Sequence, residues 1–315
     1  MTNSEKIVIT LIAHGSKLSA ELVQQLSRDI ENTLRCQIKD TKPLSDRALD
    51  IYLEDVVSST VEETRGLLSP FIEANSEIVD IIVQRNDQYR KNKKVVVFDM
   101  DSTLIYQEVI ELIAAYADVE PQVKAITDRA MNNEIDFKES LRERVALLEG
   151  LKIDTLYDEI KGKLKITKGV HELCKVLSAE GSKLAVLSGG FIQFASFIAK
   201  ELKFDVAKAN TLEMDTEGKL TGKVLGDIVD GQCKAETLLE LCEKYQCPVE
   251  ASCMVGDGGN DLPAMSVAGF GIAWNAKPRV QKAAPCRLNT DSLRDALYIF
   301  GYTDSEIESI ISKGN

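Results

Sequence analysis

The sequence predicts an α/β protein with a doubly wound, mostly parallel sheet, a small α+β domain ahead of it and a helical cap inserted after its first strand. Three observations predict this fold class. An apolar run at 95–98 leads into acidic residues, strand and helix patterns alternate after about residue 169, and only helical spacing occurs between these stretches. We therefore expect domains at 1–88 and 93–315, with the cap at about 106–167.

The first eighty residues have the pattern of a split βαβ module. Apolar periodicity predicts strands at 6–13, 48–53 and 77–83 and helices at 18–34 and 57–74. The module holds no motif with obvious chemistry, so we expect a regulatory or assembling role for it.

Residues 85–94 are polar and charged, lack apolar periodicity and therefore predict a domain boundary. The segment contains the basic run Arg90-Lys91-Asn92-Lys93-Lys94, which is short and precedes a strand. We expect this run to be a solvated linker and not a binding patch.

The region from Glu108 to about Lys165 has no strand pattern and is too long for a simple crossover between strands, which predicts the cap. Regular alternation follows, and its ligands are expected beyond the carboxyl ends of the strands. The pattern predicts helices at 169–180, 192–202, 234–245 and 261–268, strand segments at 184–187, 204–207, 251–255 and 270–274, and a hairpin near 215–219.

Composition excludes several classes of function. A content of 44% hydrophobic and 28% charged residues is that of a globular protein, and the net charge of −12 argues against a nucleic-acid partner. No apolar run approaches the ~18 residues that span a membrane, and the N-terminus lacks a signal-peptide pattern, so we expect a cytoplasmic protein without a membrane partner. Seven cysteines without a CxxC pair favour reduced, mostly buried thiols over zinc or disulfides.

Three polar clusters each follow an apolar strand directly, at 99–103, 188–190 and 256–261. Clusters at the carboxyl ends of parallel strands meet in one crevice, so these distant segments are expected to form a single site. Glycines at 189, 190 and in the third cluster leave backbone amides free to approach a ligand, which suits a phosphate.

Four carboxylates, those of Asp99, Asp101, Asp257 and Asp261, are expected in this crevice. They would repel one another unless a cation neutralised them, and hard oxygen ligands without His or Cys select Mg²⁺. One carboxylate of the Asp99-Met100-Asp101 pair can be an ionised nucleophile, and the other can be protonated and act as general acid and base, provided that a loop turns the second one away.

The order of these motifs resembles the haloacid dehalogenase superfamily of aspartyl phosphotransferases over about residues 93–300. Within it, the sequence is similar to the phosphoserine phosphatase family, through the DxDST form of the first motif, the inserted helical cap and the third cluster continued to Met265. The motifs that carry the resemblance are Asp99-Met100-Asp101-Ser102-Thr103, Ser188-Gly189-Gly190, Lys234 and Gly256-Asp257-Gly258-Gly259-Asn260-Asp261. The N-terminal module resembles the ACT-type regulatory fold.

The resemblance implies hydrolysis of O-phospho-L-serine to L-serine and phosphate, the last step of L-serine biosynthesis, through an aspartyl-phosphate intermediate. Asp99 would be the nucleophile, and Asp101 would protonate the leaving seryl oxygen and then activate water. Mg²⁺ would be held by the Asp99 side chain, the Asp101 backbone carbonyl and Asp257, with Asn260 and Asp261 in support.

The resemblance also implies how the substrate is held. Lys234 would balance the charge of Asp99 and the phosphate. The phosphoryl group would be bound by Ser188, Gly189 and Gly190, with Asn260 nearby. From the cap, Glu108 would hold the ammonium group and Arg144 the carboxylate of the serine, with Met131 and Phe137 as apolar walls, which agrees with the preference of a carboxylate for a guanidinium fork.

Alternatives remain open at this stage. Lys234 could be solvated, and Arg144 could form ordinary i,i+4 surface pairs with its helix neighbours. The chain could instead be a phosphatase for another small phosphate ester, or a non-enzymatic amino-acid-binding regulator on the same fold. The N-terminal module could sense an amino acid, or it could serve a structural or dimerising purpose, giving a homodimer.

Overall fold

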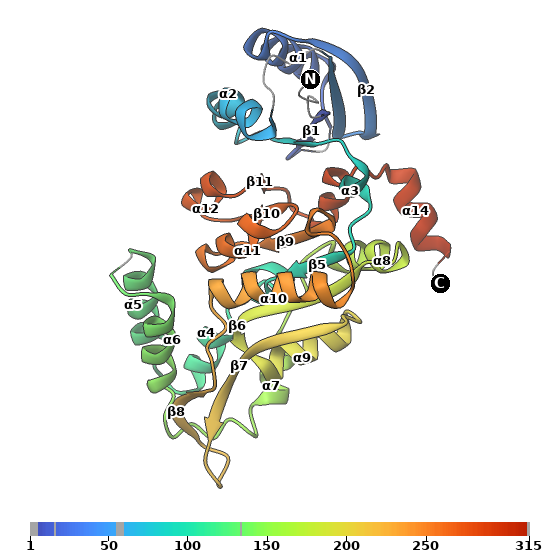
Figure 1. Cartoon of the computed structure of the whole chain (residues 1–315). Helices are drawn as coiled ribbons and strands as arrows, with labels where there is room; N and C mark the ends of the chain where they lie inside the picture. The colour runs from blue at the N-terminus through green and yellow to red at the C-terminus, as the bar shows by residue number, and fades with distance from the viewer. Residues whose placement is uncertain (1–5, 16, 55–59, 133, 314–315) are drawn as a thin grey trace.

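The computed structural model describes residues 6–15, 17–54, 60–132 and 134–313, and these form two sheets with helices packed on them (Figure 1). The N-terminal sheet has four antiparallel strands in the order β2-β3-β1-β4. The second sheet has seven strands in the order β11-β10-β9-β5-β6-β7-β8, and only β8 runs antiparallel to its neighbour. The predicted fold class is confirmed.

The strand β1 of the N-terminal sheet is buried on both faces. Ile7, Ile9 and Leu11 of β1 pack with the helices, whereas Ile12 belongs to the core of the larger sheet. The strand β2 was not predicted because it is an edge strand with most side chains exposed and lacks an apolar alternation. The elements are β1 (Ile7–Ala13), α1 (Ala20–Leu34), β2 (Gln37–Ser45), β3 (Ala48–Glu54), α2 (Val61–Ala74) and β4 (Val79–Arg85).

The start predicted for the second helix, at residue 57, lies outside the described residues. In the described part, α2 begins at Val61, because the side chain of Thr60 accepts a hydrogen bond from the backbone N–H of Glu63 and caps the helix.

The large sheet is centred on β5, which lies between the parallel strands β6 and β9 and is buried along its whole length. Burial on both faces explains the unbroken apolar run Val95–Phe98. The strands are β5 (Val95–Phe98), β6 (Lys183–Phe191), β7 (Val206–Met214), β8 (Leu220–Leu225), β9 (Ser252–Gly256), β10 (Gly271–Trp274) and β11 (Cys286–Leu288).

Helices cover both faces of this sheet, and α10 crosses in front of it in Figure 1. Val95 and Val97 pack with α10, α11 and α12, whereas Val96 and Phe98 pack with α8, α9 and the C-terminal helices. The helices are α8 (Val170–Ala179), α9 (Ile192–Glu201), α10 (Gly231–Lys244), α11 (Leu262–Val267), α12 (Pro278–Ala283), α13 (Ala296–Ile299) and α14 (Asp304–Lys313). The elements beyond Trp274 were not predicted from the sequence.

The insertion after β5 forms the expected helical cap, which lies to one side of the sheet (Figure 1). A β-bridge between Ile105 and Ile166 joins the two ends of the insertion. The cap helices are α4 (Val109–Tyr116), α5 (Glu120–Met131), α6 (Phe137–Ala146) and α7 (Tyr157–Lys161).

The prediction that the basic run 90–94 is a solvated linker is wrong for Arg90 and Lys93, which are 6% and 5% exposed. The run overlaps a short helix, α3 (Gln88–Lys91), at the contact between the two sheets. Arg90 forms a two-pronged ion pair with Asp50 of β3, with Nη1 and Nη2 donating at 2.8 and 2.7 Å. Arg90 can be buried because the carboxylate of Asp50 in the N-terminal sheet faces it. The local sequence around Arg90 does not reveal this distant partner.

All seven cysteines are free and five of them are buried, as predicted. Among the described residues, no helix has both the length and the apolar character needed to cross a membrane.

Candidate active site

Asp99 and Asp101 follow β5 in a tight turn that separates their side chains. The Asp99 backbone N–H still donates to Val255 of β9, at 2.9 Å. The chain then leaves the sheet at Asp101 (φ −63°, ψ 137°) and passes through Ser102, whose φ of 54° lies in the left-handed region. The two carboxylates therefore enter different surroundings, as the sequence required for two different roles.

Lys234 lies at the centre of the acidic cluster and is fully buried, which excludes a solvated role. Its Nζ is 2.9 Å from Asp99 Oδ1 and 2.7 Å from Asp261 Oδ1. Burial alone would lower the pKa of Lys234, but the charges of Asp261 and Asp99 outweigh burial and raise it above its ordinary value. Lys234 therefore remains an ammonium ion.

Three carboxylates gather around this ammonium. One oxygen each of Asp99, Asp257 and Asp261 lies within 4.8 Å of the others. Burial, followed by the charges of Asp99 and Asp261, raises the pKa of Asp257 well above its ordinary value. Three carboxylates with one ammonium leave an excess of two negative charges when ionised, and their donors are all hard oxygens. The donor set therefore fits a divalent cation such as Mg²⁺.

Asp101 stays outside this group of three, and its carboxyl group is enclosed. Its Oδ1 accepts a hydrogen bond from the Val109 N–H at 3.2 Å, and its Oδ2 would lie 2.7 Å from a Cβ placed on Gly190. Burial, followed by the charges of Glu108 and Asp99, raises the pKa of Asp101 well above its ordinary value. A protonated Asp101 can donate a proton to a leaving group, which Asp99 cannot do.

The segment Ser188-Gly189-Gly190 ends β6 beside these carboxylates. The buried hydroxyl of Ser188 accepts a hydrogen bond from the Gly190 N–H at 2.9 Å, so its own hydrogen remains available to a ligand. Glycine is required at both following positions, because a Cβ on Gly190 would meet Asp101 and one on Gly189 would lie 2.5 Å from the ring of Phe137. Phe137 of the cap therefore covers the loop directly.

Glu108 and Arg144 face the same site from the cap. Glu108 Oε1 accepts a hydrogen bond from the Ser102 hydroxyl at 2.7 Å. Burial lowers the pKa of Arg144 while the charge of Glu108 opposes this, so the two side chains are close enough to interact. Glu143, which is next to Arg144 in α6, pairs instead with Arg129 of α5 at 2.6 Å.

The guanidinium group of Arg144 has spare hydrogen-bonding capacity. Its Nε donates to the backbone carbonyl of Ser140 at 3.2 Å, and within the described part of the chain its other N–H groups make no hydrogen bond. These groups are free to bind a carboxylate.

Met131 and Asn260 are placed differently from the other predicted residues. Met131 ends α5 and is 45% exposed, with its Sδ 2.8 Å from Lys277 Nζ, and no described contact joins it to the carboxylates. Asn260 is closer, since its Nδ2 would lie 3.5 Å from a Cβ on Gly189, next to Phe137. The Ser188-Gly189-Gly190 segment, the third motif and the cap thus meet at Gly189.

Sequence reasoning missed several residues that hold the site in place. Thr103 donates to Asp257 Oδ1 at 3.0 Å. The buried Asn210 donates to the Gly189 carbonyl and accepts from the Val229 N–H, both at 2.8 Å. Asp230 caps α10 through the Cys233 N–H and lies 3.1 Å from Lys138 of the cap. An aspartate just before a helix is a sequence signal for a helix cap, so Asp230 could have been found. No sequence signal indicates that Asn210 contacts Gly189.

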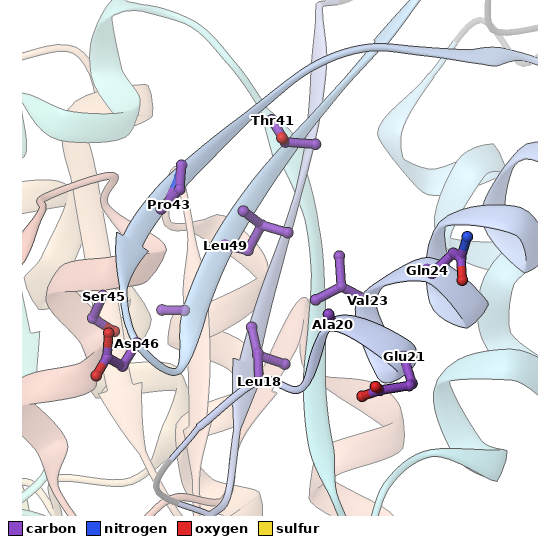
Figure 2. A pocket seen from close by; sticks show the side chains of 11 residues that line it. Leu18, Ala20, Glu21, Val23, Gln24, Thr41, Pro43, Ser45, Asp46 and Leu49 are labelled. Atoms are coloured by element: carbon purple, nitrogen blue, oxygen red, sulfur yellow. The ribbon is translucent and has the colours of Figure 1, made fainter.

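A separate hollow of about 580 Å³ lies in the N-terminal domain, far from this chemistry, between the start of α1 and the β2–β3 hairpin. Figure 2 shows Leu18, Val23 and Leu49 around it, with the carboxylates of Glu21 and Asp46 at its rim.

Comparisons with known proteins agree with this geometry. A family model described as haloacid dehalogenase-like hydrolase matches residues 93–269. A phosphoserine phosphatase of Saccharomyces cerevisiae is 64% identical over 96% of this chain and 98% of its own length. A solved phospho-aspartyl intermediate analogue of phosphoserine phosphatase covers 66% of this chain and 99% of its own, with 38% identity and a TM-score of 0.62. A solved structure of a probable phosphoserine phosphatase from Vibrio cholerae, in its unliganded form, covers 99% of this chain and 90% of its own length, with 31% identity and a TM-score of 0.68.

Proposed function

The chain belongs to the phosphoserine phosphatase family of haloacid dehalogenase-like hydrolases, and on this premise we propose that it hydrolyses O-phospho-L-serine to L-serine and phosphate. The observation that carries the proposal is the separation of two neighbouring carboxyl groups, with Asp99 paired to a buried ammonium and Asp101 enclosed with a raised pKa. Such a separation gives one nucleophile and one proton donor. This reaction would be the last step of the phosphorylated route to L-serine.

In the first half of the reaction, the Asp99 carboxylate attacks phosphorus in line with the seryl oxygen. The bond between phosphorus and that oxygen breaks, and Asp101 donates its proton to the oxygen as serine leaves. In the second half, Asp101 takes a proton from a water molecule, which attacks the aspartyl phosphate and restores Asp99. Lys234, the Ser188 hydroxyl and the amide of Gly189 hold the phosphoryl oxygens, so positioning and charge stabilisation supply most of the catalysis.

The divalent ion is proposed to be Mg²⁺, held by the Asp99 side chain, the Asp101 backbone carbonyl and Asp257, with Asn260 and Asp261 in support. When bound, it would neutralise charge on the phosphoryl oxygens. The excess of carboxylates over ammonium groups supports this assignment.

The serine end of the substrate would lie under the cap. Glu108 would accept hydrogen bonds from the ammonium group and Arg144 would donate to the carboxylate, with Phe137 and Met131 as apolar walls. The free N–H groups of Arg144 support this orientation, because a buried guanidinium fork binds a carboxylate more specifically than a lysine would.

For residues 1–88 we propose an ACT-like domain with a regulatory role, and for 93–315 the phosphatase domain with the cap at about 106–167. The hollow beside α1 supports a small-molecule effector such as serine over a purely dimerising role. Inhibition of the full chain by added serine, together with its mass in solution by light scattering, tests these roles and the proposed homodimer.

A cytoplasmic setting is supported by the seven free thiols, which suit a reducing compartment.

The deciding experiment is phosphate release from phosphoserine and from phosphoethanolamine, which lacks the carboxylate, with and without Mg²⁺. We expect a clear preference for phosphoserine that depends on Mg²⁺. Arg144→Lys should reduce the preference by raising KM for phosphoserine alone, whereas Arg142→Lys, an exposed neighbour on the same helix, should not. Equal rates on both esters in the unmodified protein would favour a phosphatase for another small ester. Absence of turnover on any ester would favour the amino-acid-binding regulator.

A further inference from the structure

The C-terminal end of α10 brings two cysteines together through its backbone geometry. Gln246 adopts a left-handed conformation with a φ of 51°, directly after the end of the helix. The Cys247 N–H then donates to the Cys242 carbonyl, and the Gln246 N–H donates to the Glu243 carbonyl, both at 3.0 Å. These two bonds define a Schellman motif, in which the side chains of the first and last residues commonly lie in contact.

In most proteins this contact is made by two apolar side chains. Here both positions are cysteine, so two thiol side chains occupy the positions that this motif brings together. Burial, followed by the neighbouring Cys247, raises the pKa of Cys242 to about 12. The Schellman bond holds the two backbones close, and a disulfide needs Cα atoms about 4.4–6.8 Å apart with converging Cβ vectors. The bond between the Cys247 N–H and the Cys242 carbonyl therefore favours the close approach of the two backbones that a disulfide between residues five apart needs.

The two thiols differ in access, which gives them different roles in oxidation. Cys242 packs in the core between α10 and the sheet, whereas Cys247 is only partly buried. Cys36, Cys174, Cys253 and Cys286 are buried, and the partly buried Cys233 lies beside Thr237. A soluble oxidant can thus reach Cys247 with a second thiol already beside it.

We propose that Cys242 and Cys247 form a reversible modification site, a dithiol that takes a two-electron oxidant of the peroxide class and becomes a disulfide. The Cys247 sulfur attacks one peroxide oxygen, the O–O bond breaks, and the thiol is oxidised to a sulfenic acid while water leaves. The Cys242 sulfur then attacks the Cys247 sulfur, the S–O bond breaks, and a second water leaves with the Cys242 proton. Two thiols are oxidised and one peroxide is reduced to two waters.

The site goes beyond the proposed phosphatase function and lies apart from its chemistry. Lys234 is in the first turns of α10 and Cys242 is eight residues later, about 12 Å along the helix axis. Its test is accordingly a measurement of thiols, whose result does not depend on turnover.

The experiment treats the full chain with limited hydrogen peroxide, blocks the remaining thiols and maps the peptides. Lys244 lies between the two cysteines, so trypsin separates them and leaves peptide 235–244 linked to the peptide that begins at Tyr245 only if the disulfide has formed. We expect this linked pair, its release by a reducing agent, and a fall from seven titratable thiols to five, since two of the seven are consumed.

Two variants separate this site from the other thiols. Cys247→Ser, at the partly buried position, should abolish the linked pair, while Cys233→Ser should leave it intact. The proposal is overturned if the unmodified protein keeps six or seven thiols and yields no linked pair, with Cys247 unoxidised or oxidised no further than a sulfenic acid. It is also overturned if the linked peptides contain Cys233. Linked peptides that persist in Cys247→Ser, through Cys253 on the same peptide, would also overturn it.

Discussion

The acidic site beyond β5 and the contact around Arg90 both bury charged side chains, but only the second balances them. At the contact, one guanidinium meets one carboxylate, and Asp50 also accepts from the Thr10 hydroxyl at 2.8 Å while Arg90 Nε donates to the Ile299 carbonyl at 3.0 Å. At the site, Lys234 faces Asp99 and Asp261 with Asp257 nearby. A balanced cluster is complete without a ligand, whereas an unbalanced one requires a cation or protons.

The largest effect is expected at Asp99, the proposed nucleophile. Asp99→Asn keeps nearly the same volume and relieves repulsion, so the fold should persist while kcat falls by on the order of 10⁴-fold. Phosphate release in the presence of Mg²⁺ measures the loss, and circular dichroism checks the fold. Turnover within tenfold of the unmodified protein would remove Asp99 as the nucleophile.

Substitutions in the balanced pair of Arg90 and Asp50 should change the stability of the protein and not its catalytic rate. Arg90→Met strands the buried carboxylate of Asp50 and should lower the free energy of unfolding by about 3–5 kcal/mol. Urea unfolding measures the change. The double variant Asp50→Asn with Arg90→Met should recover part of the loss, because no charge is then unpaired. A single variant as stable as the unmodified protein would show that the contact is not a balanced, buried pair.

A divalent ion should stabilise the folded protein directly by binding at the unbalanced cluster. Adding Mg²⁺ at about 100 times its dissociation constant should raise the free energy of unfolding by about 2.7 kcal/mol, and removing it with a chelator should reverse the gain. Thermal unfolding measures the effect without any substrate. Asp257→Asn should weaken the response, whereas Asp304→Asn, on the distant α14, should leave it unchanged. A Tm that is independent of Mg²⁺ would contradict a cation site.

The smallest expected effect concerns His14, which pairs with Asp80 of β4. Its Nε2 is 3.1 Å from Asp80 Oδ2 and its Nδ1 is 3.2 Å from the Glu77 carbonyl, so only the doubly protonated ring satisfies both acceptors. The nearby carboxylate of Asp80 raises the pKa of His14 above 6.5, although burial and Arg287 oppose this.

The sign of the pH dependence follows from that shift. A raised pKa in the folded state contributes stability that is fully present below the unfolded pKa of 6.5 and is lost as the pH rises through the folded pKa. Urea unfolding from pH 5 to 9 should show the difference between the unmodified protein and His14→Gln shrinking as the pH rises. A difference that grows with pH would contradict the assignment.

Local pattern was sufficient to predict which acidic residues and glycines come together beyond the strand ends. The apolar run into Asp99 and Asp101, the glycines after Ser188 and the acidic third motif are each written in consecutive residues, because strand burial and tight turns restrict which residue types can occur there. Arg90 and Asn210 were missed for the opposite reason. Their partners, Asp50 and Gly189, are distant in the sequence, and a polar residue whose partner is unknown resembles a solvated one.

By itself, the sequence determined the alternation of elements, the inserted cap and the order of the catalytic motifs, since periodicity and turn chemistry act over a few neighbouring residues. Tertiary structure alone decided that Lys234 is fully buried between Asp99 and Asp261, that Asp101 turns away from them, and that Arg90 pairs with Asp50 of the N-terminal sheet. Burial and charge balance depend on what the rest of the chain brings to a point in space, and that is a property of the folded molecule.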